Sequence, residues 1–164
     1  MKILVSGSSG LVGSALVSFL QKNQHEIYKL VHSRADLHAH EIAWDTQRGV
    51  LDPSLLEGFD AVVHLAGENI MGHWTEAKKK RIWESRIKGT QLLCQAIAQL
   101  KSPPAVFVCA SAVGYYGDRG SERLTEQSAK GEGFLSDVCA EWEESTRLAA
   151  EKGFELCICA LEWF

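Results

Sequence analysis

The stretch that decides the fold is Gly7-Ser8-Ser9-Gly10-Leu11-Val12-Gly13. It follows an apolar run at residues 3–5 and leads into an apolar-patterned stretch at 14–21. An apolar strand, a glycine-rich turn and a helix, in that order, form the first half of a nucleotide-binding βαβ unit. The sequence therefore predicts a nucleotide site at its own N-terminal end.

The three glycines of this turn have separate roles. Gly7 allows the tight turn out of the strand, Gly10 lets backbone amides approach a pyrophosphate, and Gly13 lets the helix pack against the strand. The helix N-terminus offers unpaired N–H groups and a partial positive charge to the phosphates. A glycine-rich turn that serves packing alone is the alternative. We expect the following residues to bind a dinucleotide: Gly7, Ser9, Gly10, Leu11, Val12 and Gly13.

Strand and helix patterns alternate along the rest of the chain. This alternation predicts an α/β fold, a doubly wound parallel (Rossmann) sheet of about six strands with helices on both faces. We see no interdomain linker, and we expect one domain over residues 1–164. Further strands are expected at 27–31, 41–44, 60–66, 106–110 and 154–161, and further helices at 74–100 and 134–152.

Composition excludes several classes of protein. The chain has 164 residues, 46% of them apolar, and a formal charge of −4, which argues against nonspecific nucleic-acid binding. It has no run of about 20 apolar residues and no leader segment, so we expect a soluble, cytoplasmic protein. The five cysteines have neither CxxC spacing nor disulfide-scaffold density, and we interpret them as small core residues. His38-Ala39-His40 lacks a third ligand, and no metal is expected.

Three further motifs carry a family resemblance. They are His64-Leu65-Ala66-Gly67-Glu68-Asn69, Glu84-Ser85-Arg86-Ile87-Lys88-Gly89-Thr90 and Ser111-Ala112-Val113-Gly114-Tyr115-Tyr116-Gly117-Asp118. With the glycine turn, they make the chain resemble the short-chain dehydrogenase/reductase superfamily in its extended NAD(P)-dependent epimerase/dehydratase branch, from residue 1 to about 160. The resemblance implies that Leu65, Ala66 and Gly67 line the cofactor site. His64 lies within a strand, and we interpret it as a hydrogen-bonded core residue.

Cofactor preference is argued from the end of the second expected strand. NAD-binding proteins generally place an acidic residue there, whereas a 2′-phosphate needs cationic partners. Here Arg34 is suited to grip a phosphate with two hydrogen bonds and Ser33 to donate another, so we expect NADP, with NAD as the alternative. Asp45 resembles an acidic residue that approaches the adenine in this superfamily. A turn-forming aspartate is the equal alternative.

The expected chemistry departs from the superfamily. Its hydride transfer uses a tyrosine, a lysine four residues later, and a serine or threonine on the preceding strand. Ser111 fits the last role, but the tyrosine and lysine positions fall on Phe134 and Val138. Tyr115 or Tyr116 would supply a displaced phenol, unless both only pack against the turn. Ser111, Tyr115 and Tyr116 are therefore the catalytic candidates, and Lys130 could in principle compensate for the missing lysine.

The C-terminal end is the second departure. Extended members continue well beyond the sixth strand and supply a substrate-binding region there, so that region is expected to be absent. A one-base frame shift would explain Glu162-Trp163-Phe164 where relatives carry an arginine-threonine-glycine segment. An uncovered sheet edge would favour a homo-oligomer.

Three functions remain open at this stage. The first is an NADP-dependent oxidoreductase or epimerase acting on a small carbonyl or sugar-nucleotide substrate. The second is a catalytically silent NADP-binding sensor or regulatory protein, and the third is a nonfunctional truncated remnant. The absence of the tyrosine and lysine makes the first function less favoured and the second more favoured.

Overall fold

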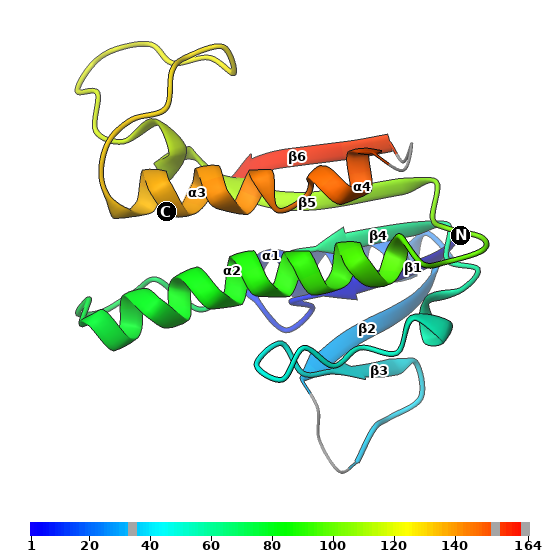
Figure 1. Cartoon of the computed structure of the whole chain (residues 1–164). Helices are drawn as coiled ribbons and strands as arrows, with labels where there is room; N and C mark the ends of the chain where they lie inside the picture. The colour runs from blue at the N-terminus through cyan, green and yellow to red at the C-terminus, as the bar shows by residue number, and fades with distance from the viewer. Residues whose placement is uncertain (33–35, 152–154, 162–164) are drawn as a thin grey trace.

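The chain folds around one sheet of six parallel strands (Figure 1). The computed structural model describes residues 1–32, 36–151 and 155–161. The strand order is β3-β2-β1-β4-β5-β6, which confirms the predicted doubly wound parallel sheet. The strands are β1 (Lys2–Ser6), β2 (Glu26–His32), β3 (Glu41–Trp44), β4 (Ala61–His64), β5 (Val106–Ala112) and β6 (Glu155–Leu161).

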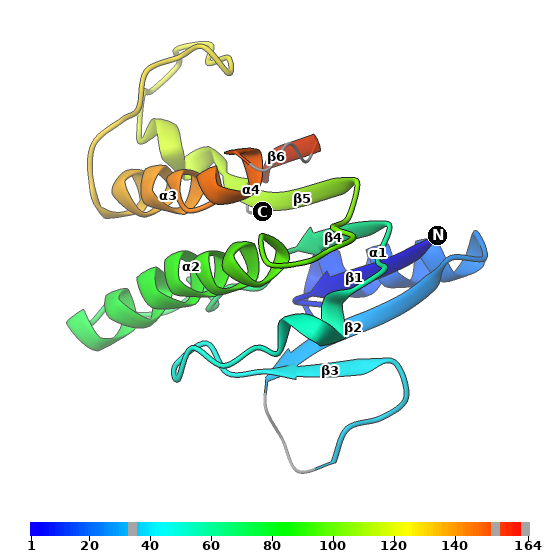
Figure 2. The same ribbon diagram turned by 45° about the vertical axis from the view of Figure 1, so that its right-hand side comes forward.

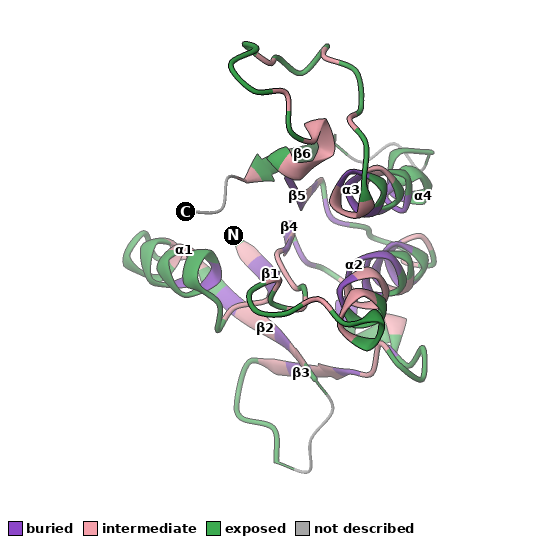
Figure 3. Ribbon diagram, turned by 90° about the vertical axis from the view of Figure 1, so that its left-hand side faces the viewer, coloured by how far each residue is buried: buried purple, intermediate pink, exposed green. Residues whose placement is uncertain are grey.

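Helices cover both faces of the sheet (Figure 3). Helix α1 packs on one face against β1 and β2, while α2 and α3 run side by side across the other face (Figures 2 and 3). This placement fits a right-handed crossover after each parallel strand. The helical elements are α1 (Leu11–Lys22), η1 (Pro53–Leu56), α2 (Glu76–Ile97), η2 (Val113–Tyr116), α3 (Phe134–Glu144) and α4 (Arg147–Glu151).

The core has two parts, because neighbouring strand residues point to opposite faces. On the α1 side, Ile3 and Val5 pack with Val17 of the helix. On the other side, the larger cluster joins Leu4 of β1 to Phe107 of β5 and to the buried stripe of α2. Both faces of β1 are therefore buried, which explains its continuous apolar sequence.

The order of the strands creates a crevice between β1 and β4. The chain leaves β1 toward one side of the sheet and leaves β4 toward the other, so the loops that follow these two neighbouring strands diverge. Such a switch point is where open α/β sheets bind ligands, outside the carboxyl ends of the strands. The glycine turn and the segment after His64 both lie there.

Several predicted boundaries need correction. Helix α1 begins at Leu11 and not at residue 14, and β5 continues to Ala112. The single helix expected at 134–152 is interrupted after Glu144. There the hydroxyls of Ser145 and Thr146 donate to the carbonyls of Glu141 and Glu143, at 2.7 Å in each case. Such local bonds compete with the helical pattern.

The interpretation of all five cysteines as core residues is wrong for strand β6. Cys94, Cys109 and Cys139 are buried, but Cys157 is exposed and Cys159 is only partly covered. The cause is the position of β6 at the edge of the described sheet, away from α1, which packs against β1 and β2. Among the described residues, no helix is both long enough and apolar enough to cross a membrane.

Candidate functional site

The glycine turn is held in a shape that only glycine fits at two positions. Gly7 has a φ of +70°, and a Cβ there would lie 2.7 Å from the carbonyl carbon of Leu65. A Cβ at Gly13 would lie 2.1 Å from the carbonyl oxygen of Gly7. Gly10 differs, because its Cβ would meet that oxygen at 3.4 Å and its φ is −74°. The fold therefore requires Gly7 and Gly13, whereas Gly10 keeps the surface of the turn free of a side chain.

A buried serine joins this turn to the loop that follows β4. The Ser6 hydroxyl oxygen accepts hydrogen bonds from the amides of Leu65 and Ala66, at 3.2 and 3.3 Å. It also lies 2.6 Å from Nδ1 of His64. Because this oxygen already accepts two N–H groups, we infer that its own proton points to Nδ1. Ser6 thus joins the loop after β1 to the loop after β4 by hydrogen bonds at the base of the crevice.

His64 is a hydrogen-bonded core residue, as its place in the strand predicted. Its Nε2 lies 3.0 Å from the hydroxyl oxygen of Thr90 on α2, which also accepts a 3.0 Å hydrogen bond from Nε1 of Trp142 on α3. Burial lowers the pKa of His64 to about 4, because the charged imidazolium would lose its water. The ring is therefore a neutral link between the sheet and two helices.

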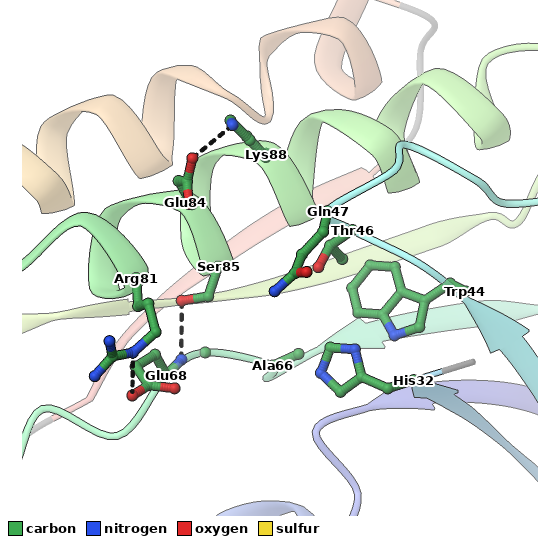
Figure 4. A pocket seen from close by; sticks show the side chains of 11 residues that line it. His32, Trp44, Thr46, Gln47, Ala66, Glu68, Arg81, Glu84, Ser85 and Lys88 are labelled. Carbon is green, nitrogen blue, oxygen red and sulfur yellow. Dashed lines mark hydrogen bonds and ion pairs between the residues drawn. The ribbon is translucent and has the colours of Figure 1, made fainter. Parts of the chain in front are cut away.

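Two adjoining hollows lie above the carboxyl ends of β1, β2 and β4. One, of about 640 Å³, is lined by the Gly7–Gly10 turn and by the end of β2. The other, of about 510 Å³, extends over Thr46 and Gln47 to the side of α2 (Figure 4). They share four lining residues, which are His32, Trp44, Ala66 and Gly67. Two adjoining hollows that share lining residues suit a ligand with two halves.

The loop between β4 and α2 is anchored to the helix (Figure 4). The amide of Glu68 donates to the Ser85 hydroxyl at 2.9 Å, and its carboxylate accepts from Lys78 at 2.8 Å and from Arg81 at 3.5 Å. The hydrogen bond from Lys78 is the main cause of the lowered pKa of the Glu68 carboxyl. The wall of the second hollow is therefore set before any ligand arrives.

The predicted cofactor residues are only partly brought together. Six of them line the first hollow: Gly7, Ser9, Gly10, Leu65, Ala66 and Gly67. Leu11 and Val12 begin α1 with exposed side chains and line neither hollow. Ser33 and Arg34 lie outside the described residues. Asp45 forms a turn, since its carboxylate accepts from the amides of Gln47 and Arg48 at 3.0 Å each, although it also borders a small hollow beside Trp44.

Sequence reasoning missed two aromatic residues at the centre of the site. His32 ends β2 and Trp44 ends β3, and their rings stack with centroids 6.1 Å apart. Both line the two hollows, so they form the wall between the glycine turn and α2. Their position at the carboxyl ends of two expected strands could have predicted this, because the carboxyl ends of parallel strands meet at one edge of the sheet.

Ser111 is not placed as a free hydroxyl. It is 2% exposed, and its Oγ donates to Oε1 of Glu143 on α3 at 2.5 Å. A hydroxyl that gives its one proton to a carboxylate has none left for a substrate carbonyl. The chemistry expected of Ser111 therefore requires Glu143 to move or to become protonated.

The family of the chain follows from its sequence. The sequence model of the NAD dependent epimerase/dehydratase family matches residues 3–137. This chain belongs to that family. The chain is 39% identical to an epimerase family protein of Mycobacterium bovis, Mb2239, over 152 residues, and 35% identical to human SDR39U1 over 155 residues. Each match covers 92% of this chain and 50% of the relative. The chain thus spans about half the length of the curated relatives it matches.

Solved structures agree with this family. A nucleoside-diphosphate sugar epimerase from Corynebacterium glutamicum superposes with a TM-score of 0.82 at 36% identity, over 98% of this chain and 33% of that one. Human SDR39U1 (isoform 2), solved with NADPH, also gives 0.82, at 30% identity, over 96% of this chain and 52% of that one. Both are epimerase-type proteins whose chains continue beyond the part matched here.

This epimerase/dehydratase chain packs apolar side chains where the sequence placed the missing acid/base pair. Phe134 stacks edge-on against Trp74, with centroids 5.8 Å apart, and Val138 is buried. Lys130 lies at the surface, where its Nζ contacts the Asp137 carboxylate at 2.6 Å. No described contact connects it to the crevice.

The two tyrosines follow β5 directly, on η2. Tyr115 and Tyr116 are half-buried and meet edge to face, with centroids 5.2 Å apart. The pKa of the Tyr116 phenol is raised, first by burial and then by the nearby carboxylates of Glu126 and Glu143. A raised pKa keeps this phenol protonated at neutral pH, so it is a potential proton donor and not a base.

Proposed function

We propose that this chain is the NADPH-binding domain of an oxidoreductase or epimerase that acts on a small carbonyl or sugar-nucleotide substrate. The observation that carries the proposal is the glycine turn, which packs against Leu65 and Ala66 and lines a hollow of about 640 Å³. Gly7 and Gly13 fix the shape of the turn, because a side chain at either position would collide with backbone, and Gly10 leaves the surface of the turn free for a ligand's phosphates near the start of α1.

The residues present fit a nicotinamide dinucleotide. The turn would hold the pyrophosphate, and the hollow beside Thr46 and Gln47 would take the adenine end. A bound nicotinamide would supply or accept the hydride. The chain's own part would be to orient the cofactor through Ala66 and Gly67 and to offer the phenol of Tyr116 as a proton donor. The human relative, solved with NADPH, supports NADPH over NADH.

A second function is favoured by two observations. The Ser111 hydroxyl donates its proton to Glu143, and the apolar residues Phe134 and Val138 occupy the positions of the missing tyrosine and lysine. Binding of NADPH without turnover, as in a redox sensor or regulatory protein, is consistent with such a site. Reduction of a carbonyl panel by NADPH separates the two functions, because only the first gives turnover.

Cofactor titration is the direct test of both. NADPH and NADH are titrated into wild type and Arg34→Ala, and the nicotinamide fluorescence is followed. We expect NADPH to bind more tightly, and Arg34→Ala to weaken NADPH about tenfold or more while leaving NADH nearly unchanged. Lys80→Ala, on an exposed face of α2, removes the same charge as a control. If neither nucleotide binds, the proposal fails and a nonfunctional remnant becomes the better description.

A further inference from the structure

Arg86 is a buried cation in the middle of α2. It is 5% exposed, and its guanidinium lies against the backbone of Gly67. A Cβ at Gly67 would lie 3.1 Å from Cζ and 3.2 and 3.3 Å from the two terminal nitrogens, so it would sit over the flat face of the group. The ring centroid of Trp142 lies 5.2 Å from Cζ. The guanidinium is therefore covered by protein, and its edges are what remain for hydrogen bonds.

Only one of its nitrogens is used by the described protein. Nη1 donates to the carbonyl of Glu68 at 3.0 Å and to that of Ile82 at 3.3 Å. Nε and Nη2 have no hydrogen-bond or ion-pair partner among residues 1–32, 36–151 and 155–161. In these residues every fully buried side-chain nitrogen has a partner, so Nε and Nη2 keep some contact with solvent. The nearby carboxylate of Glu68 is bonded to Lys78 and Arg81 instead.

The free donors have a particular geometry. Nε and Nη2 lie on one edge of the guanidinium, and this edge binds a carboxylate or phosphate through two parallel hydrogen bonds. A buried cation without a counter-charge is costly, so such a residue is generally paired. Here neutral carbonyls accept from one nitrogen, and the bidentate edge has no partner among the residues that the structure describes.

The place of Arg86 in the fold relates it to the cofactor hollow. Gly67, which the guanidinium touches, lines both hollows at the end of β4. On the other side, Arg86 packs against Trp142 of α3, and the sulfur of Cys139 on the same helix would lie 3.8 Å from a Cβ at Gly114, just after β5. Arg86 therefore lies between the segments that follow β4 and β5.

We propose that Arg86 binds an anionic group of the substrate, a carboxylate or phosphate, through Nε and Nη2. The proposal rests on the function proposed above and names its substrate class, an anionic carbonyl compound whose charged group is held beside the Gly67 segment. Arg86 thereby acts in specificity, since a neutral analogue would leave the guanidinium unpaired.

Inorganic phosphate is the probe. It is titrated into the free protein and into the NADPH complex at constant ionic strength, and ¹H–¹⁵N spectra of the arginine Nε–H groups are recorded. We expect the Arg86 Nε–H signal to shift saturably in both forms. Arg86→Lys, which keeps the charge but loses the bidentate edge, should weaken phosphate by about tenfold or more. Arg147→Gln, at an exposed position on α4, is the matched control and should bind as wild type does.

Each outcome decides between defined alternatives. Phosphate and NADPH bound together support a substrate site, whereas competition between them assigns Arg86 to a phosphate of the cofactor and overturns the substrate proposal. An Arg86 signal that does not shift, or unchanged affinity in Arg86→Lys, overturns anion binding altogether. If NADPH fails to bind, the proposed function falls, while the phosphate titration of the free protein still tests Arg86. The wild-type spectra need no variant, so misfolding of Arg86→Lys would not hide the result.

Discussion

At the scale of single residues, different glycines of the turn serve the stability of the fold and the binding of a ligand. Gly13→Ala puts a methyl group 2.1 Å from a backbone oxygen, and we expect a loss of about 3 kcal/mol in the free energy of unfolding. Gly10→Ala makes a tight but tolerable contact at an allowed φ and should change stability by less than about 1 kcal/mol. Its methyl group would nevertheless obstruct the phosphates, so NADPH affinity should fall about tenfold or more.

Urea unfolding and nicotinamide fluorescence measure these two effects separately. The comparison is matched, because both variants add one methyl group within the same turn. If Gly10→Ala bound NADPH as tightly as wild type, the turn would not be holding the pyrophosphate. Equal stability of Gly13→Ala and wild type would contradict the close packing described for the turn.

His64 makes stability depend on pH in a predictable direction. Its folded-state pKa of about 4 lies below the unfolded value near 6.5, so between these values the unfolded chain binds more protons. Stability must therefore fall as the pH falls. From pH 7 to pH 5 the expected loss is about 2 kcal/mol, and the low-pKa carboxylates of Glu57 and Glu68 remain ionised over this window.

Urea unfolding at a series of pH values tests this assignment. His64→Gln should lose most of the decline between pH 7 and pH 5, whereas His73→Gln, at an exposed position, should retain it. The same pH dependence in wild type and His64→Gln would show that other groups cause it.

At the scale of elements, periodicity and glycine placement predicted the strands within one or two residues, apart from an overlong β4, and also the interior role of His64. Such patterns record which side chains face a core. They do not predict which residue of an element distant in the sequence contacts a given side chain. Ser111 was therefore expected to be available for catalysis, although Glu143, 32 positions later, takes its proton. Arg86 stood within a quoted motif, but only the packing of Gly67 and Trp142 around it shows its burial.

Strand β6 yields a prediction that follows from its edge position. Cys157 and Cys159 project from the same face of this strand, with their sulfur atoms 3.7 Å apart. Cys94 is buried, and burial raises the pKa of its thiol to about 12, which suppresses the reactive thiolate. A thiol-specific chromogenic disulfide should therefore react with two thiols of the native protein, fastest at Cys157 because burial raises the pKa of Cys159, and with all five only after unfolding.

Variants locate the reactive pair. Cys157→Ser should reduce the rapid reaction to one thiol, and Cys94→Ala should leave it at two, because Cys94 is 0% exposed. Rapid reaction of all five thiols in the native state would contradict the buried positions of Cys94, Cys109 and Cys139. No rapid reaction would show that β6 is covered in the protein in solution.

At the scale of the whole molecule, the sheet is protected unequally. Helices α2, α3 and α4 cover one face, α1 covers part of the other near β1 and β2, and β6 forms one edge of the described sheet (Figure 3). An edge strand presents unpaired N–H and C=O groups that can pair with a second chain. Ile158 adds apolar surface there, being 40% exposed. The homo-oligomer expected from the sequence stays a prediction, and this edge is where we expect it to form.

Sedimentation at several concentrations tests association through this edge. The 164-residue chain should show a concentration-dependent monomer–dimer equilibrium. Ile158→Lys should weaken it about tenfold or more, because a lysine on an edge strand opposes pairing with another strand. Phe19→Lys, an equivalent change at an exposed position on α1, should leave association unchanged. A monomer at all concentrations would refute the prediction, while equal weakening by both variants would mean that overall charge, and not strand β6, controls association.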